Sequence, residues 1–401
     1  MLKRLKGGDF NLDEIIALDD RRKSLLTKVE VLKAERNKNS KTKPTPEMIE
    51  QMKAVGNEIK VLDEQINQTE KNLKTNLSKL PNIPFDDVPV GEDEKANVIL
   101  HKVGKVLKFG FAPKDHLQLG ETLNILDVKR AAKLSGSRFG YLKKEAVLLE
   151  FALVQFIFEK AVKRGFVPLV PPVLIKPEVM KGMGYIDTKE DLAERYYLEK
   201  DQLFLVGSAE QSIGGLHAEE IFEENELPSR AIAFSTCFRK EAGSYGKDTQ
   251  GILRVHQFDK VELFSFCHPE KSKEEHKFLI DFEEKLWQAL KIPYQVVQLS
   301  TGDMSRPSAS TVDIEAWLPG QNMYREVSSA SNTTDYQARR LNIRYKNKKG
   351  KLEFLHMLNA TGFPIGRTII AILENYQQKD GSVKIPKALQ KYTGFKVIKQ
   401  K

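Results

Sequence analysis

The segment from residue 237 to residue 262 constrains this chain more than any other part of its sequence. It lies between two apolar runs of β type, AIAFSTCF and VELFSF, with a connection that carries Gly and Ser. This pattern predicts two antiparallel strands joined as a hairpin. Charged groups on paired strands are costly to bury unless a ligand neutralises them. A polyanion with a cationic end, such as a nucleotide with an amino acid, would neutralise the charged side chains of this segment: Arg239, Lys240, Glu241, Arg254, His256, Lys260 and Glu262.

Length and composition bound the class of protein. The chain has 401 residues, which allows two or three domains and a sizeable core. Apolar residues make up 40% and charged residues 30%, as in ordinary globular proteins, and the net charge of +9 permits a polyanionic partner without requiring one.

The cysteines and the apolar runs of the sequence bear on the cellular location of the protein. The two cysteines, Cys237 and Cys267, form no CxxC pattern, which argues against a disulfide scaffold and a zinc site and favours a reducing, cytoplasmic location. The basic start of the chain has no apolar core after it, so we expect no signal peptide. The most apolar stretch, 146–158, is too short to span a bilayer, and no membrane role is predicted.

The first 80 residues have a helical pattern of their own. Apolar positions recur at spacings of three and four on both sides of a breaker-rich stretch at 37–46, which predicts an antiparallel helical hairpin. At a rise of ~1.5 Å per residue, each arm would be roughly 35–40 Å long. The same spacing fits a dimerisation coiled coil, whereas a basic turn with Lys38, Lys41 and Lys43 favours an arm that contacts RNA.

A proline-containing linker separates this hairpin from the remainder. Pro81, Pro84 and Pro89 lie in it, and we place the domain boundary there, with an N-terminal arm at 1–88 and a second domain at 89–401. The second domain has more strand-like runs than helical ones, and many strands follow each other directly. This predicts an α+β fold with a largely antiparallel sheet flanked by helices. The expected helices are 145–164, 271–290 and 367–378, and the expected strands include 231–238, 261–267, 294–300, 310–318 and 352–360.

A nucleotide bound by this chain would have to be held by side chains, because the sequence has neither a GxxxxGK[ST] loop nor a GxGxxG after a strand. Arginine side chains are the alternative, since a guanidinium can hold two phosphate oxygens at once. Arg239 and Arg367 are the leading candidates. Arg367 follows a Pro and a Gly at the expected start of a helix, whose N-terminus would attract the same anion.

Two weaker patterns contain oxygen ligands. Glu326 and Ser329 could share one Mg²⁺, although a Ser-rich run such as 325–332 is more often a loop. Ser208 and Glu210, with Glu262, could form a small polar pocket, although each acid alone is more often structural.

These features coincide in one family. The chain resembles seryl-tRNA synthetase, a class II aminoacyl-tRNA synthetase of the bacterial or organellar type, over essentially its whole length. The resemblance rests on GFVPLVPPVL at 165–174 (motif 1), the segment 238–262 (motif 2), WLPGQNMYREVSSASN at 317–332, and the segment 358–377 (motif 3). The HQFDKVE element, the AGSYGKDT loop and the YREVSS run are together specific to this synthetase, and the hairpin resembles the family's tRNA-binding arm.

The resemblance implies an ATP site and a serine site. The implied ATP-binding residues are Arg239, Lys240, Glu241, Arg254, Val255, Phe258, Glu326, Val327, Ser328, Ser329 and Arg367. Among these, Glu326 and Ser329 resemble the Mg²⁺ ligands, and Arg239, Glu326 and Arg367 are the implied catalytic residues. The implied serine-binding residues are Ser208, Ala209, Glu210, Arg239, Glu262, Asn359 and Thr361.

Several positions depart from the family pattern. Ser208 replaces a threonine, Ala360 and Thr361 stand where Gly-Ser is usual, and the loop 302–317 has lost its Gly-rich character. We assign no function to that loop.

The resemblance also implies partners: ATP, L-serine, Mg²⁺ but no zinc, tRNA(Ser), with tRNA(Sec) as a second candidate, and a second copy of the chain in a homodimer. Two other functions fit parts of the pattern, namely an RNA-binding or assembly protein on a retired synthetase scaffold and a ligase that loads an amino acid onto a carrier protein.

Overall fold

The computed structural model describes residues 10–39, 45–242 and 250–400. These fall into two compact units that separate between Pro81 and Asn82. The basic-turn residues Lys41 and Lys43, and most of the AGSYGKDT loop, lie outside the described residues.

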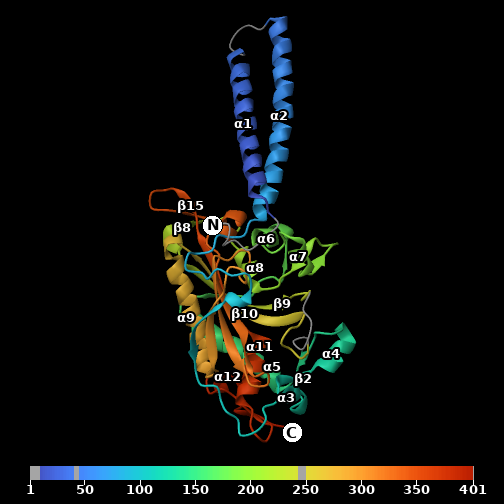
Figure 1. Ribbon diagram of the computed structural model, residues 1–401, viewed down its shortest axis with the longest axis vertical. Helices are drawn as coiled ribbons and strands as arrows, with labels where there is room; N and C mark the ends of the chain where they lie inside the picture. The colour runs from blue at the N-terminus through green and yellow to red at the C-terminus, as the bar shows by residue number, and fades with distance from the viewer. Residues whose placement is uncertain (1–9, 40–44, 243–249, 401) are drawn as a thin grey trace. The chain divides into compact units, whose positions relative to one another are not determined.

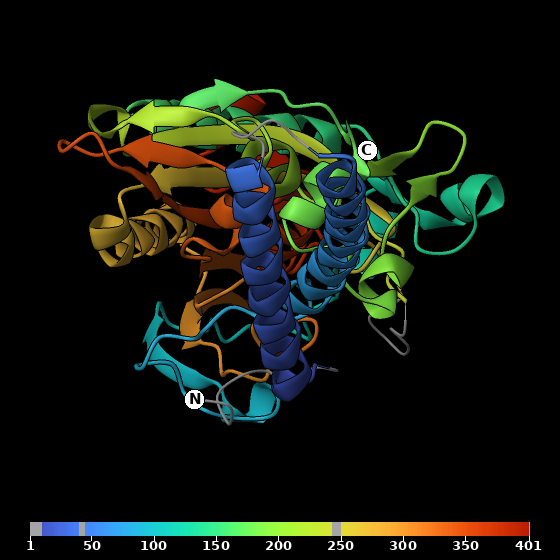
Figure 2. The same cartoon turned by 90° about the horizontal axis from the view of Figure 1, so that it is seen from above.

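The N-terminal unit is a helical hairpin. Helix α1 (Leu12–Asn39) and helix α2 (Pro46–Ser78) lie side by side in both views (Figure 1 and Figure 2). Leu25 and Val29 of α1 are buried against Ile59 and Ile66 of α2. At a rise of ~1.5 Å per residue, the helices are about 42 and 50 Å long. The predicted hairpin is confirmed, with arms longer than the sequence indicated.

The larger unit is built on an eight-stranded sheet in the order β1-β11-β12-β13-β16-β10-β9-β4. Its described strand pairs are antiparallel except for β4 with β9, so the predicted fold class is confirmed. The strands are β1 (Val98–Val103), β4 (Val167–Leu169), β9 (Ser229–Phe238), β10 (Gln257–Cys267), β11 (Tyr294–Gln298), β12 (Ser310–Leu318), β13 (Met323–Asn332) and β16 (His356–Pro364).

Helices and small sheets surround this sheet (Figure 1). The helices are α3 (His116–Thr122), α4 (Val128–Ser135), α5 (Glu145–Val162), α6 (Pro177–Gly182), α7 (Lys189–Ala193), α8 (Ala209–Gly214), α9 (Ser272–Leu290), α10 (Tyr336–Leu341), α11 (Ile365–Tyr376) and α12 (Gln390–Thr393). The short strands are β2 (Leu126–Asp127), β3 (Tyr141–Leu142), β5 (Leu174–Ile175), β6 (Tyr197–Leu198), β7 (Leu203–Leu205), β8 (Ile221–Glu223), β14 (Arg344–Lys346), β15 (Leu352–Phe354), β17 (Val383–Lys384) and β18 (Val397–Ile398).

Strand β10 separates two hydrophobic cores, because successive side chains of a strand point to opposite faces. Val261 and Leu263 join a core that contains residues of α5, α9 and α11. Phe264 and Phe266 join a second core with Met357 and residues of α8 and α10. The side chains at 258, 260 and 262 share the face of this second core, so any ligand that they bind lies on that face.

Most predicted elements are present, with two exceptions. The run 352–360 forms two strands rather than one, because β15 pairs in a small sheet with β14 whereas β16 lies in the large sheet. The expectation that the Ser-rich run at 325–332 is a loop is wrong. It is part of β13, whose small side chains pack in the middle of the sheet between β12 and β16.

One polar contact crosses between α5 and β10. Glu150 of α5 is buried and hydrogen-bonds to Asp259 of β10, whose carboxylate also accepts a bond from Thr236 at 2.6 Å. Burial, followed by the charge of Asp259, raises the pKa of Glu150 to about 8. At neutral pH the Glu150 carboxyl is therefore protonated and donates to Asp259.

We predict that the Glu150 carboxyl makes the free energy of unfolding decrease as the pH rises. Its contribution is complete below the pKa of the unfolded chain and is lost as the pH rises through about 8. Relative to Glu150→Gln, which keeps a donor but cannot ionise, the free energy of unfolding should fall by about 1.4 kcal/mol per pH unit between roughly pH 5 and pH 8. Urea denaturation at several pH values measures this slope. The exposed Glu199→Gln is the control and should follow the parent chain, and a parallel slope for Glu150→Gln would contradict the assignment.

Candidate active site

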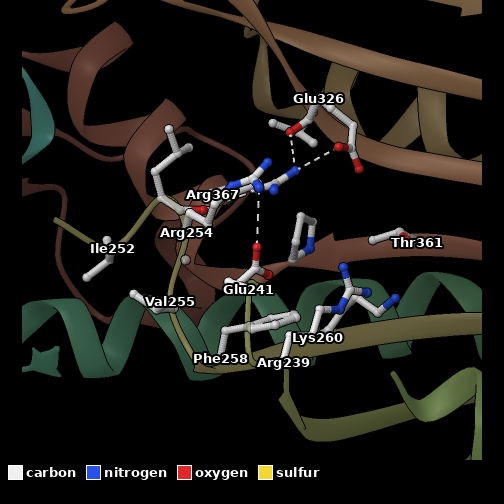
Figure 3. A pocket seen from close by; sticks show the side chains of 14 residues that line it. Arg239, Glu241, Ile252, Arg254, Val255, Phe258, Lys260, Glu326, Thr361 and Arg367 are labelled. Atoms are coloured by element: carbon white, nitrogen blue, oxygen red, sulfur yellow. Dashed lines mark hydrogen bonds and ion pairs between the residues drawn. The ribbon is translucent and has the colours of Figure 1, made fainter. Parts of the chain in front are cut away.

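A pocket on the second face of the sheet gathers the sequence-predicted nucleotide residues (Figure 3). Arg239 and Arg367, which lie 128 positions apart in the chain, both line it. The full lining is Arg239, Glu241, Ile252, Leu253, Arg254, Val255, Phe258, Lys260, Glu326, Val327, Thr361, Pro364, Gly366 and Arg367.

Arg239 is positioned by the end of β9. Its backbone N–H donates to the His256 carbonyl at 2.9 Å, which continues the hairpin beyond Phe238. Its Nε donates to the Gly207 carbonyl at 3.1 Å, and its guanidinium lies over the Phe258 ring at 5.3 Å. The terminal nitrogens of Arg239 can therefore face the pocket while Nε is held by the protein.

Glu241 and Arg254 lie on the connection between β9 and β10. The Glu241 carboxylate pairs with Arg254 Nη1 at 3.3 Å, as Figure 3 shows. Glu241 has a φ of 51°, a left-handed conformation that is uncommon for a residue with a side chain. Lys240, between Arg239 and Glu241, does not line the pocket. Its Nζ instead lies over the Tyr196 ring at 5.6 Å.

Arg367 occupies the first turn of α11, as predicted. Its Nη1 donates to the Glu326 carbonyl at 2.9 Å and pairs with the Glu326 carboxylate at 3.1 Å. The surrounding protein opposes ionisation of Glu326, but the charge of Arg367 outweighs it and lowers the pKa of that carboxyl. Half of the Glu326 side chain (51%) remains exposed, so its carboxylate is charged and accessible to a cation.

A β-bulge in β13 brings Glu326 and Ser329 together. Glu326 pairs with Glu315 and Ser328 pairs with Ile314, so Val327 has no partner on β12. In a regular strand, side chains three positions apart point to opposite faces. Because Val327 is an extra residue, the side chains of Glu326 and Ser329 point to the same face of the sheet, where both line one cavity.

The other two residues of this run behave differently. Val327 is buried at the edge of the nucleotide pocket. The Ser328 hydroxyl accepts a hydrogen bond from Trp287 Nε1 of α9 at 3.1 Å, so its side chain lies on the helix-covered face. Only the backbone of Ser328 could therefore contact a nucleotide in the pocket.

The candidate Mg²⁺ ligands have a suitable neighbour. Asp313 of β12 lies opposite Ser329, hydrogen-bonds to it, and lines the same cavity. One of its carboxylate oxygens is buried without a hydrogen-bond partner. Two carboxylates and a hydroxyl form an oxygen donor set of the kind that Mg²⁺ prefers.

The predicted serine residues form a buried polar cluster. Ser208 caps α8, accepting from the Glu210 backbone N–H at 3.1 Å and donating to Glu262 Oε2 at 3.1 Å. Thr361 lies directly opposite Glu262, and Asn359 lies two residues before it on the same face of β16. Ala209 is fully buried in the second core, where it supports the cluster by packing.

Lys260 neutralises this cluster. Its Nζ is ion-paired with Glu262 Oε2, and both residues are almost fully buried. Burial raises the pKa of Glu262 to about 7, although Lys260 opposes the increase. Oε2 is therefore occupied by Lys260 and Ser208, whereas the structure assigns no hydrogen bond to Oε1 within the described residues.

Comparison with known proteins decides the family. The protein-family model for the tRNA synthetase class II core domain (G, H, P, S and T) matches residues 195–376. The family model for the seryl-tRNA synthetase N-terminal domain matches residues 1–84. The chain belongs to the seryl-tRNA synthetase family. It is a serine–tRNA ligase with the class II fold.

Full-length relatives and solved structures agree with this family. The serine–tRNA ligase of Dictyoglomus turgidum is 43% identical over 100% of this chain and 96% of its own length, and that of Sulfurihydrogenibium sp. is 50% identical over 81% and 78%. The seryl-tRNA synthetase of Pyrococcus horikoshii complexed with ATP has a TM-score of 0.92, with 40% identity over 97% of this chain and 93% of that chain. The cytoplasmic enzyme of Naegleria fowleri in complex with AMP has a TM-score of 0.88 and 34% identity, over 97% and 92%.

Some residues of this synthetase site had no role predicted from sequence. Lys260 lies in motif 2, but neither the pattern nor the resemblance assigns it a specific role. Tyr185 and Gln337 hold the Glu210 carboxylate, donating to it at 2.8 and 3.1 Å. They lie 25 and 127 positions from Glu210, in segments without a motif, so no sequence signal could have identified them.

We predict that Arg367→Lys lowers kcat/KM for ATP by about 10²- to 10³-fold, because a lysine lacks the planar fork with which the guanidinium can hold the Glu326 backbone on one nitrogen and phosphate oxygens on the others. Steady-state pyrophosphate exchange with varied ATP measures this. Arg339→Lys is the control, since Arg339 pairs with Asp335 on the exposed face of α10. An unchanged KM and kcat for Arg367→Lys would rule out a direct role in ATP binding.

Proposed function

We propose that the pocket of Figure 3 activates L-serine with ATP and that the serine is then transferred to the 3′-terminal adenosine of tRNA(Ser). The observation that carries this proposal is that Arg239 and Arg367 line one pocket beside the Ser208–Glu262–Thr361 cluster. Two guanidinium groups suit a triphosphate, and the polar cluster suits a small hydroxylated amino acid.

Activation joins the two ligands without a covalent enzyme intermediate. A serine carboxylate oxygen attacks the α-phosphorus of ATP, the bond to the bridging oxygen breaks, and pyrophosphate leaves. Arg239 offsets the charge that grows on the α-phosphate, and Arg367 holds the leaving group. Such a reaction depends on positioning and electrostatics rather than on a proton-transfer residue.

Transfer completes the reaction. The 2′- or 3′-hydroxyl of the terminal adenosine attacks the seryl carbonyl carbon, the bond from that carbon to the phosphate oxygen breaks, and AMP leaves with the hydroxyl proton on its phosphate. The ring of Phe258 and the side chain of Val255 line the place proposed for adenine. Glu241 would accept from the adenine amino group, and Arg254 would be released from Glu241 to reach a phosphate.

Mg²⁺ is proposed as the cofactor. When bound, it would supply positive charge next to the triphosphate, and Glu326 and Ser329 would hold it. The orphaned oxygen of Asp313 beside them supports this assignment.

We propose that serine specificity depends on Glu262 Oε1, the carboxylate oxygen to which the structure assigns no hydrogen bond from the residues it describes. We propose that Glu262 and Thr361 bind the serine hydroxyl, while Ser208, Glu210 and Asn359 complete the amino acid site. Alanine would leave these buried polar groups unpaired, which costs much more than a missing methylene in an apolar pocket.

The remaining partners belong to the same proposal. The hairpin would bind tRNA(Ser), and tRNA(Sec) where a cell contains it. Two unpaired cysteines agree with a cytoplasmic location, and none of the described helices has the length and apolarity to cross a membrane. A homodimer would cover apolar side chains of α5, β4 and the residues after β4 that are more than half exposed: Leu148, Phe151, Val167 and Val170.

We expect serine-dependent exchange of labelled pyrophosphate into ATP. The measurement compares serine with alanine and threonine in the presence of Mg²⁺, and the rate with serine should be the highest by at least about 10²-fold. Absence of exchange with every amino acid, in a sample shown to be folded, would refute the proposed function.

We further expect that deletion of residues 1–81 separates the two half-reactions. Pyrophosphate exchange should persist within about threefold, because the pocket lies entirely within the larger unit. Charging of tRNA(Ser) should fall by about 10²-fold or more as the phosphate contacts are lost. Exchange serves as the folding control, and undiminished charging would show that the hairpin does not bind tRNA.

A further inference from the structure

Arg195 has an unusual environment for an arginine. It lies between α7 and β6, outside the segments to which a ligand role was assigned. Its backbone N–H is bonded to the Leu192 carbonyl at 3.1 Å, and its guanidinium lies over the Tyr185 ring at 5.1 Å. The Tyr185 hydroxyl is bonded to Glu210, so Arg195 borders the serine cluster.

Among the described residues, none forms a hydrogen bond or an ion pair with this guanidinium. Its Nε is fully buried without a hydrogen-bond partner. The nearby carboxylate of Asp191 is used elsewhere, since it accepts from the Thr188 backbone and pairs with Arg306 at 3.8 Å. A buried donor is costly unless it is bonded, so a ligand with an acceptor oxygen would complete this environment.

A second guanidinium approaches the same place. Arg239 donates to the Gly207 carbonyl, and Nη1 of Arg195 lies 3.0 Å from the point where a Cβ on Gly207 would be. Burial and then the charge of Arg239 lower the pKa of Arg195. Two like charges that repel each other favour an anion that can contact both.

The neighbouring residues identify that anion. Gly207 is followed directly by Ser208, whose hydroxyl belongs to the proposed serine site. An amino acid bound to Ser208, Glu210 and Glu262 would have its α-carboxylate within reach of this side of the site. We infer that Arg195, together with Arg239, binds the carboxylate of the serine substrate and holds it for attack on the α-phosphorus. Gly207 leaves the space that the Arg195 guanidinium needs.

The inference rests on the proposed function, and the experiment separates the two. Serine binding is measured by calorimetry without ATP, alongside serinol, which has the hydroxyl and amino groups but no carboxylate. Arg195→Met should raise the Kd for serine by about 10- to 100-fold, the loss of one charge-assisted hydrogen bond, and leave the Kd for serinol within about twofold. ATP binding should be unchanged.

Two further variants keep the inference testable if Arg195→Met folds poorly. Arg195→Lys keeps the charge but loses the planar fork and should weaken serine binding less. Gly207→Ala should displace the guanidinium and weaken serine binding, but it should add nothing in the Arg195→Met background. Arg339→Met, on the exposed face of α10, is the matched control and should bind serine as the parent chain does.

Three outcomes would overturn the inference. Equal losses for serine and serinol would mean that Arg195 only supports Tyr185 and Glu210. A loss of ATP binding alone would assign Arg195 to the α-phosphate instead. Unchanged binding of all three ligands would leave it without a role in the site. If the parent chain itself fails to bind serine, the proposed function fails rather than this inference alone.

Discussion

The alternation of side chains along β10 organises the catalytic unit. One set of positions, among them Val261 and Leu263, packs under α5, α9 and α11, and the other set, including Phe258, Lys260 and Glu262, faces the pocket. Because a strand has a period of two, the charged set cannot enter the helix-covered core without moving the apolar set out of it. The register of β10 with β9 and β16 therefore determines both the stability of the sheet and the composition of the site.

The charges on the pocket face are balanced in pairs. Lys260 neutralises Glu262, Arg254 neutralises Glu241, and Arg367 neutralises Glu326. The first pair is buried, where separation of the partners would leave an uncompensated charge. The other two include partly exposed side chains, which a phosphate and a metal ion could separate at little cost. The rigid pair thus suits the proposed amino acid site, whereas the exchangeable pairs suit the proposed nucleotide site, whose ligand is larger and more variably charged.

Much of this arrangement could be predicted from sequence, and the limits have physical causes. The hairpin follows from periodicity, because each helix buries a single apolar stripe, and the strands β9 and β10 follow from their continuous apolar runs, because both faces of each strand pack in a core. Strand β13 could not be predicted in this way, since serines and alanines in a central strand have the composition of a loop. The bulge at Val327 could not be predicted either, because nothing in YREVSS distinguishes a regular strand from one with an extra residue. Tyr185, Arg195 and Gln337 reach the site only through folding, from segments with no recognisable pattern.

The bulge determines which side chains of β13 face the cavity. If Val327 were paired with β12 as in a regular strand, the side chain of Ser329 would turn toward α9, where Trp287 already occupies the space, and the hydroxyl that binds Trp287 would turn outward. The backbone ladder with β12 could still form in that arrangement. The position of one unpaired residue, rather than the hydrogen bonding of the ladder, therefore decides whether Glu326 and Ser329 can share the proposed cation.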